Sequence, residues 1–113
     1  MEPGNRYALV VRVNACKGHG DKFEALMQSL LANLATEDCF VSFNLHRDPK
    51  DRDQFMFYEL WTDEARYMEV RNREYFQTYL KDRVALIEEK VERMTSALER
   101  VVTRSGESHA ESR

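Results

Sequence analysis

The chain has 113 residues, of which 42% are hydrophobic and 33% are charged. This length is close to the usual size of one domain, and the balance is typical of a globular protein with a packed core. The net charge is only −3, and basic residues are interleaved with acidic ones. Neither nucleic acid nor an anionic membrane is therefore expected as a partner.

No apolar run is long enough to span a bilayer, and the first residues, MEPGNR, lack the basic-then-apolar order of a secretory signal. We therefore expect a cytoplasmic protein. Cys16 and Cys39 show no CxxC spacing and no histidine partners at the spacing of a metal site, which indicates two reduced thiols. No clustering of histidine, cysteine and carboxylate residues predicts a metal site, and no cofactor is expected.

The first third of the chain predicts a strand and then a helix. The segment Tyr7–Val13 is rich in β-branched and aromatic residues and is apolar on both faces up to Arg12, as in a strand buried on two sides. Apolar residues then recur at helical spacing from Phe23 to Leu34. Asp21 or a residue close to it is expected to cap this helix.

The middle of the chain predicts a hairpin. The segment Phe40–His46 alternates apolar and polar residues, with Ser42, Asn44 and His46 on one face. The residues RDPKDRD that follow have turn chemistry, and the apolar run FMFYELW after them supplies the second strand.

Two helices are expected next. Thr62 or Asp63 can cap a short helix, and a longer one begins near Arg73. The apolar spacing from residue 80 to residue 101 also fits one continuous helix. Against that, the β-branched residues near its end favour a strand, and a β-α-β-β-α order lacks its closing strand. We place this strand at Val91–Val102.

The expected fold is α+β, a ferredoxin-like β-α-β-β-α-β domain over residues 1–103, followed by a disordered tail over residues 104–113. The strand that ends at Trp61 has apolar residues on both faces, and two helices cover one face of a sheet. Since a large exposed apolar patch is rare on a monomer, we expect the open sheet face to form a homodimer. The alternative is a monomer with an amphipathic hairpin.

Several segments together resemble one known family. EDCF, HRDP, FYELWTDEARY and REYF, in this order after the first strand, resemble the antibiotic biosynthesis monooxygenase domain, and the likeness extends from Tyr7 to Val102. The resemblance implies a dimeric α/β barrel with a pocket in each subunit between the sheet and the helices. Members of the family include cofactor-free oxygenases of anthrone- or quinol-like aromatics, haem-degrading enzymes and an isomerase of a phosphorylated signalling sugar.

The resemblance also points to site residues. Trp61 and Tyr67 keep the spacing of the anthrone-oxidising members, where a Trp and a Tyr line the aromatic pocket, although the Asn of those members is Phe57 here. Two histidines frequent in the family are replaced by Val70 and Tyr75. The candidate catalytic residues are Trp61, Tyr67 and Tyr75. Each has a structural alternative, as a core ring or as a hydroxyl at the rim.

Charged and polar residues complete the predicted pocket. An electron-rich phenol or enol can react with O₂ without metal or flavin if the site removes a proton and shields the anion from water. Lys81 or Arg83 is expected to stabilise the oxyanion. Glu59 is either the base or a structural partner of Arg12, and His46 is either a pocket group or a solvated side chain. The candidate pocket residues are Asn44, His46, Phe57, Glu59, Lys81 and Arg83.

Two functions stay open. One is a cofactor-independent monooxygenase acting on a small aromatic or quinol-type substrate. The other is a non-enzymatic dimer that binds a ligand or stabilises a partner, because a shared fold does not imply shared chemistry. An apolar pocket with polar groups converging near Trp61 favours the enzyme, and an interior filled by side chains favours the binding protein. Haem degradation is not expected, since no histidine follows Arg73 in its helix to ligate iron.

Overall fold

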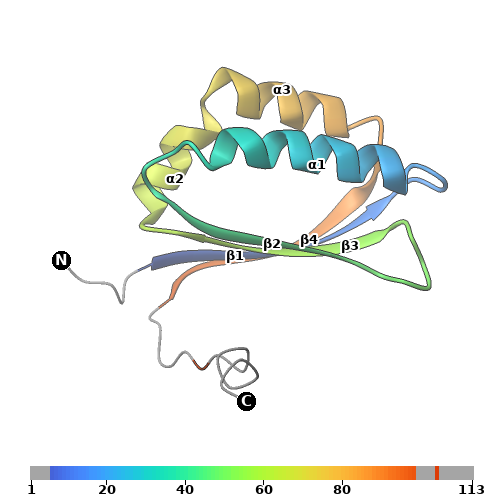
Figure 1. Cartoon of the computed structure of the whole chain (residues 1–113), viewed down its shortest axis with the longest axis horizontal. Helices are drawn as coiled ribbons and strands as arrows, with labels where there is room; N and C mark the ends of the chain where they lie inside the picture. Colours follow the sequence, from blue (N-terminus) through green and yellow to red (C-terminus); the bar gives the residue numbers. More distant parts are fainter. Residues whose placement is uncertain (1–5, 99–103, 105–113) are drawn as a thin grey trace, which may run out of the picture.

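The computed structural model describes residues 6–98 and 104, without the side chains of residues 89–98. Over these residues, three helices lie on one face of a four-stranded antiparallel sheet (Figure 1). The elements are β1 (Arg6–Ala15), α1 (Gly20–Leu34), β2 (Phe40–Arg47), β3 (Gln54–Trp61), α2 (Glu64–Arg71), α3 (Glu74–Arg83) and β4 (Ile87–Leu98). The predicted α+β class and ferredoxin-like order are confirmed. The predicted disordered tail lies outside the described residues, apart from residue 104.

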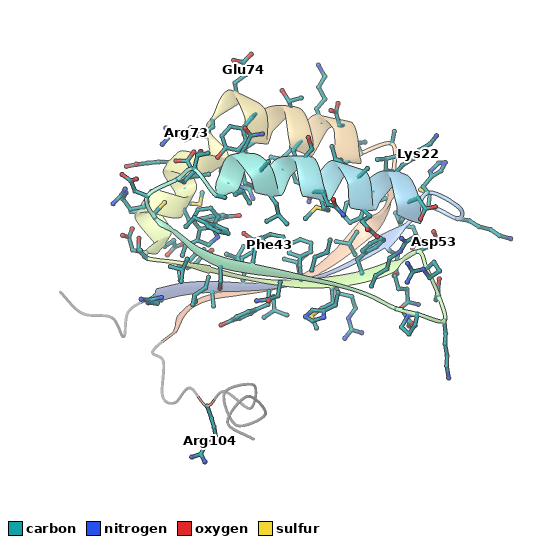
Figure 2. The ribbon with its side chains drawn as sticks, viewed as in Figure 1. Lys22, Phe43, Asp53, Arg73, Glu74 and Arg104 are labelled. Atoms are coloured by element: carbon teal, nitrogen blue, oxygen red, sulfur yellow. The ribbon has the colours of Figure 1, made fainter. Side chains whose placement is uncertain are left out.

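The strand order is β2-β3-β1-β4, so β3 and β1 form the middle of the sheet. Tyr7 is paired with Trp61, and Val11 with Phe57. Because side chains alternate along a strand, these odd-numbered positions of β1 and β3 share one face. That face is buried under the helices, where Phe43 lies between the sheet and α1 (Figure 2). No helix in the described part of the chain is long and apolar enough to cross a membrane.

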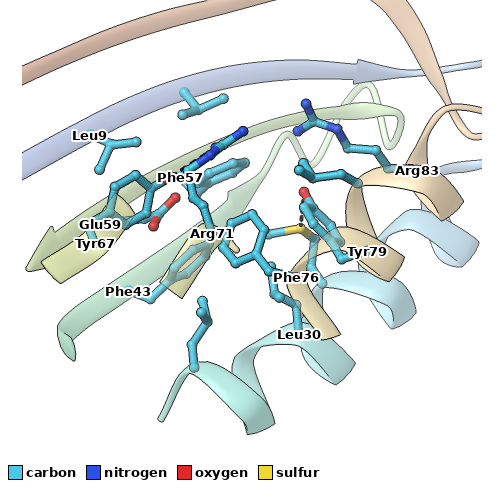
Figure 3. Close-up of a pocket in the computed structure, with 14 residues that line it drawn as sticks. Leu9, Leu30, Phe43, Phe57, Glu59, Tyr67, Arg71, Phe76, Tyr79 and Arg83 are labelled. Carbon is cyan, nitrogen blue, oxygen red and sulfur yellow. Dashed lines mark hydrogen bonds between the residues drawn. The ribbon is translucent and has the colours of Figure 1, made fainter. Parts of the chain in front are cut away.

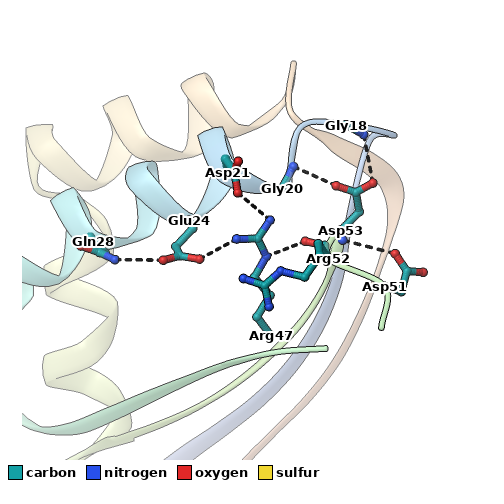
Figure 4. Close-up of polar contacts among 9 residues, drawn as sticks. All are labelled: Gly18, Gly20, Asp21, Glu24, Gln28, Arg47, Asp51, Arg52 and Asp53. Atoms are coloured by element: carbon teal, nitrogen blue, oxygen red, sulfur yellow. Dashed lines mark hydrogen bonds and ion pairs between the residues drawn. The ribbon is translucent and has the colours of Figure 1, made fainter. Parts of the chain in front are cut away.

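The start of α1 differs from the prediction. Asp21 does not cap the helix: His19 occupies the N-cap position and makes no side-chain capping bond. Instead, the carboxylate of Asp53, from the β2–β3 loop, accepts the backbone N–H groups of Gly18 and Gly20 at 2.9 Å each (Figure 4). These two bonds lower the pKa of Asp53, and the bond from Gly18 has the larger effect. The sequence could not reveal this cap because its donors and acceptor lie more than thirty residues apart.

Arg47 fastens the β2–β3 hairpin to the first turns of α1. Its guanidinium contacts Asp21 at 2.9 Å and Glu24 at 2.8 Å, and its Nε donates to the carbonyl of Arg52 at 2.6 Å. The same group lies over the ring of Phe55. Gly20 fits against this cluster, because an added Cβ there would press on the Arg52 carbonyl and the Arg47 guanidinium.

The last strand is confirmed, with a corrected start. β4 begins at Ile87 rather than Val91, and residues 99–103 lie outside the described part. The alternative of one continuous helix is wrong, since α3 ends at Arg83. Ile87 pairs with Ala15 and Leu98 with Arg6, with a shift of register between Val13 and Ala15, so β4 pairs with most of the length of β1. Such long-range pairing overrides the local helical spacing.

The other face of the sheet carries no helix (Figure 1). Met56 and Tyr58 are 39% and 37% exposed there, and Val10 and Leu60 are half-buried. Cross-strand pairing of Val10 with Tyr58 makes these side chains neighbours. An apolar patch therefore covers the middle of the open face.

Because β4 completes the edge of β1, a chain that ends at Lys90 should expose the unpaired backbone of β1 and aggregate. A chain that ends at Arg104 keeps all of β4 and serves as the control. Size-exclusion chromatography with light scattering, together with circular dichroism, would measure the outcome. A soluble and fully folded product ending at Lys90 would contradict this role of β4.

Candidate functional site

A small cavity lies between the sheet and the helices (Figure 3). Its volume is about 20 Å³, which is room for about one water molecule. Its apolar and aromatic lining consists of Leu9, Val11, Met27, Leu30, Leu34, Phe43, Phe57, Phe76, Tyr79 and Leu80. Four further lining residues bring polar groups: Glu59, Tyr67, Arg71 and Arg83. The cavity is nearly filled by side chains, yet polar groups converge in it.

Glu59 is a buried carboxylate at this cavity. It is 5% exposed and projects from β3 toward the helices. Trp61 comes two residues later on the same face, and its indole N–H donates to Glu59 Oε1 at 2.9 Å. Trp61 itself is fully buried and does not line the cavity. Its contribution is to hold the carboxylate in place.

Tyr67 lies beside this carboxylate. Asp63 caps α2 by accepting the backbone N–H of Arg66 at 2.8 Å, as predicted, and the helix then directs Tyr67 onto the Trp61 ring, with 5.1 Å between ring centroids. One helical turn later, Arg71 Nη1 donates to the Tyr67 hydroxyl at 3.2 Å. Burial, and then the charge of Glu59, raises the pKa of Tyr67 to about 12. Tyr67 is therefore a neutral phenol at physiological pH.

The other end of the cavity is formed by α3. Tyr79 is buried and its hydroxyl lies 3.2 Å from the sulfur of Met27. The guanidinium of Arg83 lies over the Tyr79 ring, 5.6 Å from its centroid. Figure 3 places Glu59 and Tyr67 at one end, Tyr79 and Arg83 at the other, and Arg71 between them.

Tyr75 and Lys81 do not reach this cavity. The Tyr75 hydroxyl donates to Glu37 Oε2 at 2.7 Å, in a cluster that also holds Arg73. Burial, and then the Glu37 contact, raises the pKa of Tyr75 above its usual range. Tyr75 instead lines an open groove between α1 and α3. Lys81 is exposed on α3 and lines neither space.

Asn44 and His46 lie on the opposite face of the sheet and are exposed. Strand alternation gives the helix-facing positions of β2 to Phe43 and Leu45, so the placement of Asn44 and His46 in this pocket does not hold. The suggested pairing of Glu59 with Arg12 fails for the same reason, since Arg12 is exposed on the open face, opposite Met56.

Four of the predicted site residues therefore line one cavity: Phe57, Glu59, Tyr67 and Arg83. Trp61 does not line it but bonds Glu59. Sequence reasoning missed Arg71, although its position four residues after Tyr67 on a helix was a usable signal. In the described part of the chain, no group of three or more histidine, cysteine or acidic side chains could hold a metal ion.

The family model of the antibiotic biosynthesis monooxygenase matches residues 6–82. The chain belongs to this family. The match covers β1 through nearly all of α3, which are the elements that build the cavity. The resemblance inferred from the sequence motifs is therefore confirmed. No curated protein matches the chain.

Several solved structures share the fold of this antibiotic biosynthesis monooxygenase family member. PA3566 from Pseudomonas aeruginosa is 24% identical, with 90% of this chain and 100% of that one covered and a TM-score of 0.77. SnoaB, a cofactor-independent oxygenase from Streptomyces nogalater, is 18% identical, with 88% and 99% covered and a TM-score of 0.76. A conserved protein from Methanosarcina mazei is 12% identical, with 86% and 96% covered and a TM-score of 0.77. At these identities, the likeness shows the fold alone.

The Glu37 cluster gives a stability prediction. The hydrogen bond from Arg73 lowers the pKa of Glu37 below its ordinary 4.5, so the folded state favours the carboxylate. Its contribution is complete above about pH 4.5 and is lost as the pH falls through the lower folded-state pKa. We expect Glu37→Gln to lower the free energy of unfolding by about 1 kcal/mol at pH 7, a modest value because half-exposed Arg73 is screened by water.

Urea denaturation of the wild type and Glu37→Gln at pH 7 and pH 3 would measure this difference, with the exposed Glu88→Gln as the control. The gap between wild type and Glu37→Gln should narrow at the lower pH. An equal gap at both pH values would show that the carboxylate charge is not responsible.

Proposed function

We propose that this protein is a cofactor-independent monooxygenase that oxidises a small aromatic phenol or quinol in the cavity between the sheet and the helices. The observation that carries this proposal is the buried Glu59 carboxylate, fixed by the Trp61 indole in an aromatic cavity beside Tyr67. Membership of the monooxygenase family supports the reaction class. SnoaB, which shares the fold, is a cofactor-independent oxygenase.

In this proposal Glu59 is the base. It removes a proton from the substrate and gives an electron-rich anion, while the neutral hydroxyl of Tyr67 donates a hydrogen bond to the developing oxyanion. Arg71 contacts the Tyr67 oxygen in the empty site, and this contact is released when the Arg71 side chain moves to admit the substrate. The apolar lining keeps water from the anion.

The chemistry balances without a further reductant. The substrate anion passes electrons to O₂ and forms a carbon–oxygen bond, giving a peroxide on the substrate carbon once protonated. Loss of water from that peroxide leaves a carbonyl group. One oxygen atom of O₂ enters the product and the other leaves as water. Glu59 accepts the first proton and returns it to the peroxide. It then removes the remaining hydrogen of that carbon as a proton while hydroxide departs, and this proton and the hydroxide form the water.

A substrate ring needs more space than the cavity now has, so side chains must move when it binds. The long side chains of Arg71 and Arg83 are the movable part of the lining, since each lies over aromatic rings rather than in an ion pair. Their displacement leaves Glu59 and Trp61 in place. The proposed site therefore opens by movement of the two arginine side chains, while the part that holds Glu59 stays rigid.

A second candidate is a non-enzymatic dimer that binds a ligand or stabilises a partner. The observation that favours it is the nearly filled interior, with a cavity of about 20 Å³. We rank it second because polar groups, the Glu59 carboxylate among them, converge in this aromatic cavity, as is typical of a reaction site.

The enzyme proposal predicts O₂ consumption with members of a panel of anthrones and hydroquinones. Glu59→Gln should lower kcat by about 10²-fold or more, because the base is removed. Tyr67→Phe should also lower kcat, and Trp61→Phe should do so by about tenfold through loss of the hydrogen bond that positions Glu59.

Tyr75→Phe is the matched control, because its hydroxyl bonds Glu37 outside the cavity. An oxygen electrode and product analysis would record the rates. Absence of turnover across the panel would contradict the proposal, as would a rate that is the same in Trp61→Phe, Glu59→Gln and the wild type.

We also propose a homodimer through the open sheet face and a cytoplasmic location. The apolar patch around Met56 and Tyr58 supports the dimer, since all three described helices cover the other face. The free thiols of Cys16 and Cys39 suit a reducing compartment.

The dimer is tested with two matched double variants. Met56→Lys with Tyr58→Lys places two charges on the open face and should give a monomer, because burying both charges is unfavourable. Met68→Lys with Val84→Lys changes two exposed apolar residues of the helical layer, 47% and 72% exposed, and should keep the dimer. Light scattering after size exclusion would measure both masses. A wild-type monomer, or a dimer that survives the first pair, would contradict this interface.

A further inference from the structure

Two arginines, Arg71 and Arg83, line the cavity. In the part of the chain that the structure describes, no acidic side chain lies within ion-pair distance of Arg71 or Arg83. Arg71 contacts the Tyr67 hydroxyl and lies over the ring of Phe76, 5.4 Å from its centroid. Arg83 lies over the ring of Tyr79. Both side chains are half-buried.

Two other arginines of this fold are paired with acids. Arg47 contacts two carboxylates, Asp21 and Glu24, and Arg73 contacts Glu37. Those pairs connect segments that are distant in the sequence, which is a structural use of arginine. Among the residues that the structure describes, Arg71 and Arg83 form no such pair, and both line the cavity (Figure 3).

The charges of the cavity are unevenly distributed. Glu59 is at one end, held by Trp61, while Arg71 and Arg83 bring two positive charges along the path to the other end. A planar guanidinium binds a carboxylate through two parallel hydrogen bonds and stacks on aromatic rings. In the described part of the chain, one of the five N–H groups of Arg71 donates to Tyr67.

We propose that the natural substrate is an aromatic acid, whose carboxylate is bound by Arg83 and Arg71 while its hydroxyl-bearing end lies at Glu59 and Tyr67. The rings of Phe76 and Tyr79, now covered by the two guanidinium groups, form the wall on which the substrate ring stacks. This assignment rests on the proposed function for the position of the reacting end, but binding itself does not require turnover.

The test is a binding measurement on the full chain with two matched probes. The first, 6-hydroxy-2-naphthoate, carries a hydroxyl and a carboxylate at opposite ends, and the second, 6-hydroxy-2-naphthamide, replaces the charge with a neutral amide of similar shape. Isothermal titration calorimetry at pH 7 should show the acid binding at least about tenfold more tightly than the amide, as expected for charge-assisted hydrogen bonds.

Arg71→Gln and Arg83→Gln should each weaken the acid by about tenfold and leave the amide nearly unchanged, and Arg83→Lys should retain part of the preference. Arg66→Gln is the matched control, because Arg66 is an exposed arginine of α2 that does not line the cavity. If Arg71→Gln has a lower unfolding temperature through loss of the Tyr67 contact, Arg83→Gln carries the test, since the observed contact of Arg83 is with the face of the Tyr79 ring.

Equal affinities for acid and amide would overturn the proposal, and so would failure of both probes to bind or an equal loss in Arg66→Gln. The results also distinguish failure of the acid-binding site from failure of the proposed oxidation. An arginine-dependent preference for the acid, in a protein that consumes no O₂ with any quinol, would support the acid-binding site and reject the oxidation. Turnover with neutral quinols, together with equal affinities for the acid and the amide, would support the oxidation and reject the acid-binding site.

Discussion

The hydrogen bond between the Trp61 indole and the Glu59 carboxylate is the contact on which the rest of the site depends. A carboxylate that is 5% exposed is unfavourable in a core unless polar groups satisfy it. Strand alternation supplies the donor, because residues 59 and 61 of β3 point to the same face. Packing of Trp61 against Phe40 and Tyr67 then fixes the indole, so the aromatic core positions the acidic group.

The fold uses arginine in two different ways, and the difference locates function. At the start of α1 and at the start of α3, arginines meet acids and fasten loops and helices together. Around the cavity, Arg71 and Arg83 meet aromatic rings and a phenol. Cation–π contacts are weaker than paired salt bridges with good geometry and are easily exchanged for an anion. The same residue type therefore joins helices and loops through ion pairs at the helix ends, and at the cavity it is the group that we propose to bind a carboxylate.

Sequence patterns predicted the elements well because each depends on local spacing: alternating β2, amphipathic α1 and the Asp63 cap of α2 all follow from near neighbours. Long-range contacts escaped prediction. Asp53 satisfies α1 from the far loop, and β4 begins four residues early because β1 offers its whole edge. In the site, the family spacing found Trp61 and Tyr67, whereas Asn44 and His46 were assigned against the alternation that the sequence itself displayed. The partner of Tyr75 could not be foreseen, since Glu37 precedes it by almost forty residues.

A cavity that holds about one water molecule is compatible with an oxygenase because of which side chains close it. Closure by Phe57 or Trp61 would make opening as costly as disrupting the core, since these rings are almost completely buried. Closure by Arg71 and Arg83 is different: their charged ends can reach water along flexible stems, so rotation about side-chain bonds uncovers the rings of Phe76 and Tyr79. In the proposed mechanism, such a site has room for about one water molecule beside Glu59 when it is empty, and a substrate ring replaces the arginine stems when it is occupied. The rigid and the movable parts of the site thus come from different elements. The carboxylate comes from β3, and the two arginines come from the last turn of α2 and the last turn of α3.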